Sequence, residues 1–289
     1  ACASALASGD ASAREDLRIV LTAMHGVGAA ITSRVLAEAG FTNVSLVAAQ
    51  ADPDPDFPTV PFPNPEESGA LDMAIEQARE QGADLIIAVD PDADRCALAV
   101  PDPASETGWS PLSGDQIGSL LGEFLAERGM KGSLANSIVS SRLLSRIARA
   151  HGLEHHTTLT GFKWIARAPG LGFGYEEAIG FCPDPAHVRD KDGIATSVVA
   201  ASLVASLKAQ GRSVWDELER LARLHGLHVS SPLTFRVDDI EQIASGMARL
   251  RAQPPSVLAG SPVVEVSDLS QGYRGLPPTD GVLVLTEAG

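Results

Sequence analysis

Short apolar runs alternate with segments of helical periodicity along the first hundred residues. Residues 85–89 and 96–100 are almost entirely apolar, and residues 43–48 alternate between polar and apolar positions, as strands do. Strands and helices that alternate in this way form a sheet with helices packed on its faces. The predicted strands are residues 18–22, 43–48, 85–89 and 96–100, and the predicted helices lie near residues 31–39 and 71–78.

A second set of elements follows residues 101–111, a proline-rich stretch that we interpret as a linker. Its predicted helices are residues 117–125, 143–150, 194–207 and 214–224, and its predicted strands are residues 133–139 and 173–175. From about residue 227 the pattern changes to a strand at 233–237, a helix at 240–250 and short strands near 263–266 and 282–285.

This pattern predicts an α/β protein: two consecutive α/β domains with mixed sheets flanked by helices, followed by a partial α+β domain. We place the domains at residues 1–110, 111–226 and 227–289. The sequence stops just after a predicted strand, so we expect the third domain to be truncated.

Composition and charge narrow the classes of partner. Hydrophobic residues make up 44% of the 289 residues, which is enough for buried cores, and the formal net charge is -15 at pH 7. A negative field of this size disfavours nucleic acids and anionic membranes as partners. A phosphorylated small molecule stays compatible, because a few cations or one metal ion reverse the potential within a cleft.

The cysteines and the first residues bear on the compartment. Cys2, Cys96 and Cys182 form no C-x-x-C pair, so neither a zinc site nor a disulfide framework is indicated, and a reducing cytoplasmic location fits best. No apolar run reaches transmembrane length. Residues 1–13 lack the pattern of a signal peptide and do not begin with Met, so we expect the chain to start inside a longer protein.

The sharpest chemical feature is the loop of residues 90–95, which follows the predicted strand 85–89. It holds Asp90, Asp92 and Asp94, and three carboxylates so close repel one another unless a cation lies between them. Hard oxygen ligands of this kind suit magnesium, and the guanidinium of Arg95 suits phosphate. A calcium EF-hand loop is disfavoured because its required Gly and Glu positions hold Arg and Pro here; an acidic surface turn without a ligand is the other alternative.

Several other segments carry weaker signals. Glu176 and Glu177 lie between two glycines and could accept hydrogen bonds from sugar hydroxyls, or form a solvated turn. The cations of residues 189–193 could bind phosphate, although pairing with their own Asp neighbours is favoured. Lys163 follows a glycine turn and could line a binding cleft, although a lone Lys is usually solvated. Residues 25–28, His-Gly-Val-Gly, could cradle an anion or allow tight packing of a helix on a strand.

Taken together and in order, these segments resemble the α-D-phosphohexomutase superfamily, the phosphoglucomutases and phosphomannomutases. The resemblance covers nearly the whole chain, from about residue 18 to residue 289. The segments that carry it are residues 25–28, 57–60 with 63–67, 90–95, 161–165 and 174–180.

The resemblance implies an intramolecular phosphotransferase that interconverts sugar 1-phosphate and sugar 6-phosphate, with glucose or mannose as the sugar. In that family a phosphoserine donates its phosphoryl group, and a sugar 1,6-bisphosphate is the intermediate and activator. The implied cofactor is Mg²⁺, the implied partners are small-molecule sugar phosphates, and we expect a monomer or homodimer. Carried over, Asp90, Asp92 and Asp94 bind magnesium, Arg95 lies beside the transferring phosphoryl group, Glu176 holds sugar hydroxyls, Lys163 lines the same cleft, and Glu177 is a weaker candidate for substrate binding.

The sequence departs from the family pattern in three places. Neither the Ser-His-Asn-Pro serine loop nor the Arg-Pro-Ser-Gly-Thr phosphate clamp occurs in these 289 residues, so we expect this polypeptide alone not to turn over. Ala178 stands where the family commonly has Ser, which leaves the choice between glucose and mannose open. Family members with Asp-Pro-Asp-Ala-Asp-Arg and Phe-Lys-Trp segments, as at residues 90–95 and 162–164, include enzymes active on ribose or deoxyribose phosphates, so a phosphopentomutase is the main alternative. A non-catalytic sugar-phosphate sensor and a phosphatase with an Asp nucleophile are further alternatives.

Overall fold

The computed structural model describes residues 6–7 and 10–288, which fall into two compact units divided at Ser230. Cys2 and part of the segment 1–13 lie outside the described residues. The described part confirms the predicted fold class, with two consecutive α/β layers of mixed sheets in the first unit and a further sheet in the second. The proposed domain limits stay a prediction.

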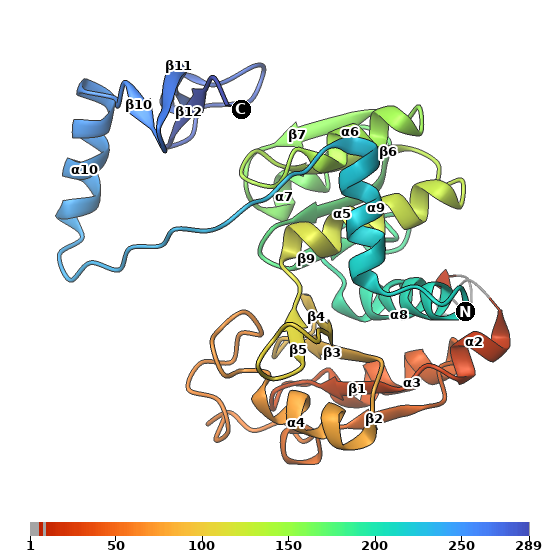
Figure 1. Cartoon of the computed structure of the whole chain (residues 1–289). Coiled ribbons are helices and arrows are strands. Elements are labelled where there is room, and N and C mark those ends of the chain that lie inside the picture. Colours follow the sequence, from red (N-terminus) through yellow and green to blue (C-terminus); the bar gives the residue numbers. More distant parts are fainter. Residues whose placement is uncertain (1–5, 8–9, 289) are drawn as a thin grey trace. The chain divides into compact units, whose positions relative to one another are not determined.

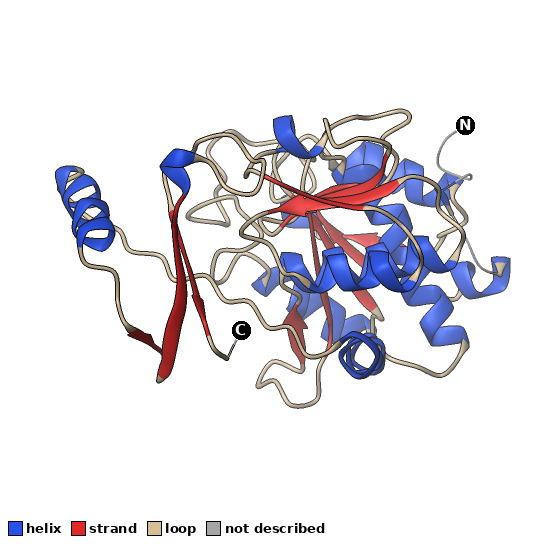
Figure 2. Cartoon of the chain, turned by 90° about the horizontal axis from the view of Figure 1, so that it is seen from above, coloured by secondary structure: helices blue, strands red, loops and turns tan. Residues whose placement is uncertain are grey.

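The first sheet has the order β2-β1-β3-β4-β5, in which β1 is parallel to β2 and β3 while β4 and β5 are antiparallel. Figure 2 shows helices on both sides of the strands in the first unit. The elements are α2 (Ala11–Glu15), β1 (Ile19–Thr22), α3 (Ala29–Glu38), β2 (Val44–Leu46), η1 (Ala48–Gln50), α4 (Asp72–Gln81), β3 (Leu85–Val89), β4 (Cys96–Pro101) and β5 (Trp109–Pro111).

The interpretation of residues 101–111 as a linker was wrong. These residues form the end of β4, a short turn and the whole of β5, which pairs with β4 in an antiparallel hairpin. The hydroxyl of Ser110 donates to Asp102 Oδ2 at 2.6 Å within that turn. Proline is tolerated here because β5 is an edge strand, where a missing backbone donor leaves no ladder bond unmade. The predicted boundary between residues 110 and 111 therefore falls inside a strand.

The second sheet has the order β7-β6-β8-β9, with β6 parallel to β7 and β8, and β9 antiparallel to β8. Sequence analysis missed β7 and β9, because β7 is made of polar residues and β9 has three residues. The elements are α5 (Gly114–Glu127), β6 (Ser133–Ser137), α6 (Leu143–Ala150), β7 (His155–Thr158), α7 (Phe162–Ile165), β8 (Leu171–Glu176), β9 (Gly180–Cys182), α8 (Gly193–Ala209) and α9 (Val214–His225) (Figure 1).

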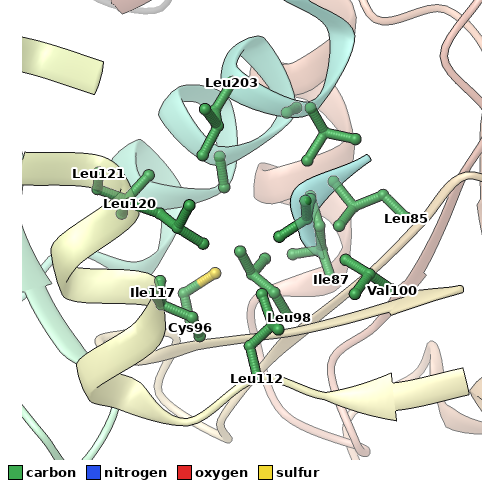
Figure 3. Close-up of a cluster of buried hydrophobic side chains, with 14 of the residues drawn as sticks. Leu85, Ile87, Cys96, Leu98, Val100, Leu112, Ile117, Leu120, Leu121 and Leu203 are labelled. Atoms are coloured by element: carbon green, nitrogen blue, oxygen red, sulfur yellow. The ribbon is translucent and has the colours of Figure 1, made fainter. Parts of the chain in front are cut away.

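One hydrophobic core joins the two sheets. Helix α8 is buried on nearly all sides and packs against β3, β4 and β9. Figure 3 shows the centre of this core, where Leu98 of β4, Leu120 of α5 and Leu203 of α8 come together. Because the core is continuous, the two sheets and the loops at their edges hold a fixed mutual arrangement, which positions the candidate site.

The second unit contains α10 (Glu241–Ala252), β10 (Val257–Leu258), β11 (Ser261–Asp268), η2 (Leu269–Gln271) and β12 (Val282–Thr286). Its strands form an antiparallel sheet in the order β10-β11-β12. The predicted strand at 233–237 was wrong: these residues are in neither a helix nor a strand, and Leu233 and Phe235 are exposed. Alternation of apolar residues makes a strand only where a neighbouring edge accepts its hydrogen bonds.

No single helix among the described residues is long and apolar enough to cross a membrane. The pair α8 and α9, bent by 92° at the break between them, passes the same test by length and composition only.

Candidate active site

The loop of residues 90–95 lies at the carboxyl end of β3 and closes on Asp90. The buried Asp90 carboxylate accepts two hydrogen bonds from Arg95, one from the backbone N–H to Oδ1 at 2.9 Å and one from Nε to Oδ2 at 2.7 Å. The N–H of Ala93 donates to the carbonyl of Asp90 at 2.9 Å, and Ala93 has a left-handed backbone (φ 59°). The loop is therefore a tight turn that fixes the Arg95 side chain.

This turn brings the three predicted metal ligands together. Asp90, Asp92 and Asp94 each present one carboxylate oxygen within 4.8 Å of the others. Asp90 is buried, Asp94 is half-buried and Asp92 is exposed, so the group opens toward solvent. Burial raises the pKa of Asp90, and the hydrogen bonds from Arg95 act against that rise. Clustered carboxylate oxygens are the donors that a hard divalent cation prefers, so the residues fit Mg²⁺.

The glycines of residues 25–28 serve close packing. A Cβ on Gly26 would lie 2.4 Å from Pro91 Cα, and one on Gly28 would lie 2.7 Å from Ala93 Cβ. The N–H of Val27 donates to the Pro91 carbonyl at 2.8 Å. The turn therefore packs closely, but against the loop of residues 90–95, which we call the metal loop after its predicted ligands. The alternative that this turn cradles an anion stays a prediction.

Glu176 is the last residue of β8, and Glu177 begins the loop between β8 and β9, which lies beside the metal loop. Arg95 forms an antiparallel bridge with Gly180, and the N–H of Cys96 donates to the Ile179 carbonyl at 3.1 Å. The two loops belong to different sheets, so these bonds join the sheets directly at the site.

The side chain of Glu176 faces several charged groups and makes no hydrogen bond or ion pair with other described residues. Partial burial raises its pKa; Lys191 acts against the rise, Glu177 and Asp94 add to it, and Arg95 opposes it. Its carboxylate therefore lies within electrostatic range of the metal loop.

Glu177 is engaged differently from its neighbour. One of its oxygens, Oε2, accepts hydrogen bonds from the hydroxyls of Ser137 at 2.9 Å and Ser140 at 2.8 Å. Ser137 is the last residue of β6, Ser140 lies in the turn that follows, and both are buried. The two adjacent glutamates thus point to different surroundings.

Two models of one protein family match the chain: "Phosphoglucomutase/phosphomannomutase, alpha/beta/alpha domain II" over residues 2–104, and domain III of the same family over residues 113–224. Together they cover most of the chain, in the order that the fold shows. The chain belongs to the phosphoglucomutase/phosphomannomutase family.

Individual members of this family are similar over most of the chain. A Haemophilus influenzae protein named "Probable phosphomannomutase" is 47% identical over 255 residues, which cover 88% of this chain and 52% of that protein. A Staphylococcus aureus phosphoglucomutase is 34% identical over 268 residues, which cover 88% of this chain and 48% of that protein. The chain therefore spans about half the length of these relatives.

The fold agrees with a solved structure. A Thermus thermophilus protein that carries the name phosphomannomutase superimposes with a TM-score of 0.72 at 23% identity, covering 99% of this chain and 56% of that one. At this identity the likeness concerns the fold alone.

Lys191, one of the cations of residues 189–193 considered in the sequence analysis, lies against the loop of residues 90–95, a contact that the sequence did not predict. Its ammonium lies 3.0 Å from Asp94 Oδ2 and 3.4 Å from Asp190 Oδ1, and 5.4 Å from the ring centre of Phe162. It pairs with its own Asp neighbour, as favoured from the sequence, and also reaches the metal loop. Its place just before α8 was a signal, but the contact spans almost a hundred residues, which no local pattern shows.

Asn64 was also missed, although its segment 63–67 was part of the resemblance. Its Oδ1 accepts a hydrogen bond from Arg95 Nη1 at 3.4 Å. Lys163 is exposed, makes no ion pair with other described residues, and lies with its ammonium 5.9 Å from the ring centre of Trp164. Its assignment to the cleft stays a prediction.

The two described cysteines should be unreactive in the folded protein. Burial raises the pKa of Cys96 and Cys182 to about 12, from an ordinary value of 9.0. Since the thiolate is the reactive form, neither should be alkylated at pH 8 until the chain unfolds. Above pH 9 the unfolded chain loses these protons first, so stability should fall as the pH rises toward 12. Peptide-resolved alkylation with and without denaturant checks this, and rapid labelling of native Cys96 would contradict it.

Proposed function

We propose that this chain carries the metal-binding and sugar-binding parts of a mutase that interconverts the 1-phosphate and 6-phosphate of glucose or mannose. The observation that carries the proposal is the bridge between Arg95 and Gly180, which joins the Asp loop of one sheet to the Glu loop of the other. A phosphoryl group bound at the first loop and a sugar bound at the second would then be neighbours.

In this proposal Asp90, Asp92 and Asp94 hold Mg²⁺, whose charge, when bound, stabilises the phosphoryl oxygens. Arg95 is held through Nε by Asp90, so its orientation is fixed before the phosphoryl group arrives. Its planar guanidinium suits the oxygens of phosphate.

Glu176 is the proposed acceptor for sugar hydroxyls, because its carboxylate is not engaged by other described residues and lies within range of the metal loop. Lys163, also without an ion pair to other described residues, is the proposed cation of the same cleft. The phosphoserine carrier and the sugar 1,6-bisphosphate intermediate belong to the proposal as well. We place the carrier outside the 289 residues, since these do not contain the family's serine loop.

A phosphopentomutase is the second candidate. What supports it is the resemblance of residues 90–95 and 162–164 to family members active on pentose phosphates, together with Ala178, which has no hydroxyl where the family commonly has Ser. This keeps ribose and deoxyribose phosphates in the substrate test.

The test is mutase activity of the full-length protein that contains this chain. Glucose 1-phosphate, mannose 1-phosphate and ribose 1-phosphate are compared, each with magnesium and a trace of the matching sugar bisphosphate. We expect isomerisation of a hexose phosphate that stops when EDTA removes the metal. Turnover of ribose 1-phosphate alone would favour the pentomutase. Binding of sugar phosphates without any turnover would favour a sensor and overturn the proposal.

A further inference from the structure

Two adjacent glutamates, at the end of β8 and the start of the next loop, have different surroundings. The Glu176 carboxylate makes no hydrogen bond or ion pair with other described residues, whereas the Glu177 carboxylate accepts two hydroxyl hydrogen bonds on Oε2. We propose that Glu177 is a positioning residue, which with Ser137 and Ser140 fixes the β8–β9 loop so that Glu176 presents its carboxylate to the substrate. This inference rests on the function proposed above.

The bonds to Glu177 are of a strong kind. Each serine has one hydroxyl proton, and an ionised carboxylate oxygen can accept both. Hydrogen bonds to a charged acceptor are roughly twice as strong as those between neutral groups. Ser137 is 2% exposed and Ser140 is 8% exposed, so their hydroxyls have little access to competing water. The two hydroxyls also lie 2.8 Å from each other, so removing the Glu177 carboxylate would leave one serine able to donate to the other and the second hydroxyl proton without its acceptor.

The turn of residues 137–141, which contains both serines, is also held by a second carboxylate. Asp115, in the first turn of α5, accepts a hydrogen bond from the Ser141 N–H at 2.7 Å and another from the Tyr175 hydroxyl at 2.8 Å. Tyr175 directly precedes Glu176. Residues 137–141 are therefore held by two carboxylates, that of Glu177 in the β8–β9 loop and that of Asp115 in α5. Asp115 also holds Tyr175 of β8, the strand that leads into this loop.

The backbone of Glu177 is confined as well. A Cβ on Gly114 would lie 1.9 Å from the Glu177 carbonyl oxygen, so the start of α5 lies directly against this residue. With its carbonyl against α5 and its carboxylate on β6, Glu177 belongs to the framework of the second sheet. Glu176, one residue earlier, is the group left to meet a ligand.

The experiment is a double-mutant cycle in the full-length protein: Glu177→Ala, the pair Ser137→Ala with Ser140→Ala, and all three together. We expect the first two variants each to lower kcat/KM for the sugar phosphate by about tenfold, mainly through KM, and the triple variant to lose no more than either. Glu177→Gln, which keeps an acceptor oxygen, should recover part of the loss. Glu106→Gln, at an exposed turn, is the matched control and should behave as wild type.

Losses that multiply in the triple variant would overturn the inference, because Glu177 would then act on the substrate independently of the serines. Amide hydrogen exchange of residues 138–141 and 177–180 gives a readout that does not depend on activity. We expect faster exchange of both segments in Glu177→Ala and in the serine pair. Unchanged exchange would overturn the inference even if the wild type turns over, whereas faster exchange in a protein without turnover would overturn only the proposed function.

Discussion

Asp92→Asn should lower magnesium-dependent turnover by about 100-fold or more and leave the fold intact. Substitutions in the outer shell of a metal site already cost roughly 10–100-fold, and Asp92 is proposed to bind the ion directly. Asp92 is exposed and has no hydrogen bond or ion pair with other described residues, so its change removes a ligand without stranding a buried partner. Asp90 is a poorer probe, because it also holds Arg95.

The measurements are a magnesium titration of mutase activity and calorimetric magnesium binding, each set beside thermal unfolding. The control is Asp56→Asn, at an exposed turn between η1 and α4. It changes the net charge by the same amount as Asp92→Asn and should leave both titrations as in the wild type. Unchanged magnesium affinity in Asp92→Asn would show that the triad does not hold the ion. An equal loss of magnesium affinity in Asp92→Asn and Asp56→Asn would show that the overall negative charge of the protein attracts the ion, and not that Asp92 is a ligand.

The three candidate metal ligands could be predicted from the sequence because they are close together in the chain. The apolar run of β3 and three carboxylates in five residues stand next to each other in the chain, and ligand sites in open sheets lie at carboxyl ends of strands. Lys191 and the serines that hold Glu177 could not be found in this way. They reach the site only because α8 and β6 pack there, and such contacts depend on the tertiary fold.

Errors in the fold have the same physical origin. The polar strand β7 carries no hydrophobic signal, yet it forms because β6 supplies a parallel edge for its hydrogen bonds. Residues 233–237 have the right alternation but no such edge among the described residues. The prolines around β5 suggested a linker, although an edge strand tolerates them. In each case a segment forms a strand only if a neighbouring strand is there to pair with it, and the local sequence does not show whether one is.

Gly26→Ala tests whether the turn of residues 25–28 supports the metal loop. The added methyl group would lie 2.4 Å from Pro91 Cα and 2.5 Å from Pro91 O, and both are backbone atoms that cannot rotate away. Either the turn or the loop must shift, which strains the Val27–Pro91 hydrogen bond. Overpacking of this kind costs about 1–3 kcal/mol. Because Pro91 lies between Asp90 and Asp92, we also expect magnesium affinity to fall by roughly tenfold.

Urea unfolding and calorimetric magnesium binding measure the two effects separately. Gly246→Ala is the matched control: it lies within α10, its new Cβ would meet no heavy atom within 4 Å, and alanine there should stabilise the helix by up to about 1 kcal/mol. Its magnesium affinity should be that of the wild type. If Gly26→Ala unfolds earlier but binds magnesium normally, the turn contributes only to packing. A loss in both measurements would mean that the geometry of the carboxylates depends on a contact made more than sixty residues earlier in the chain.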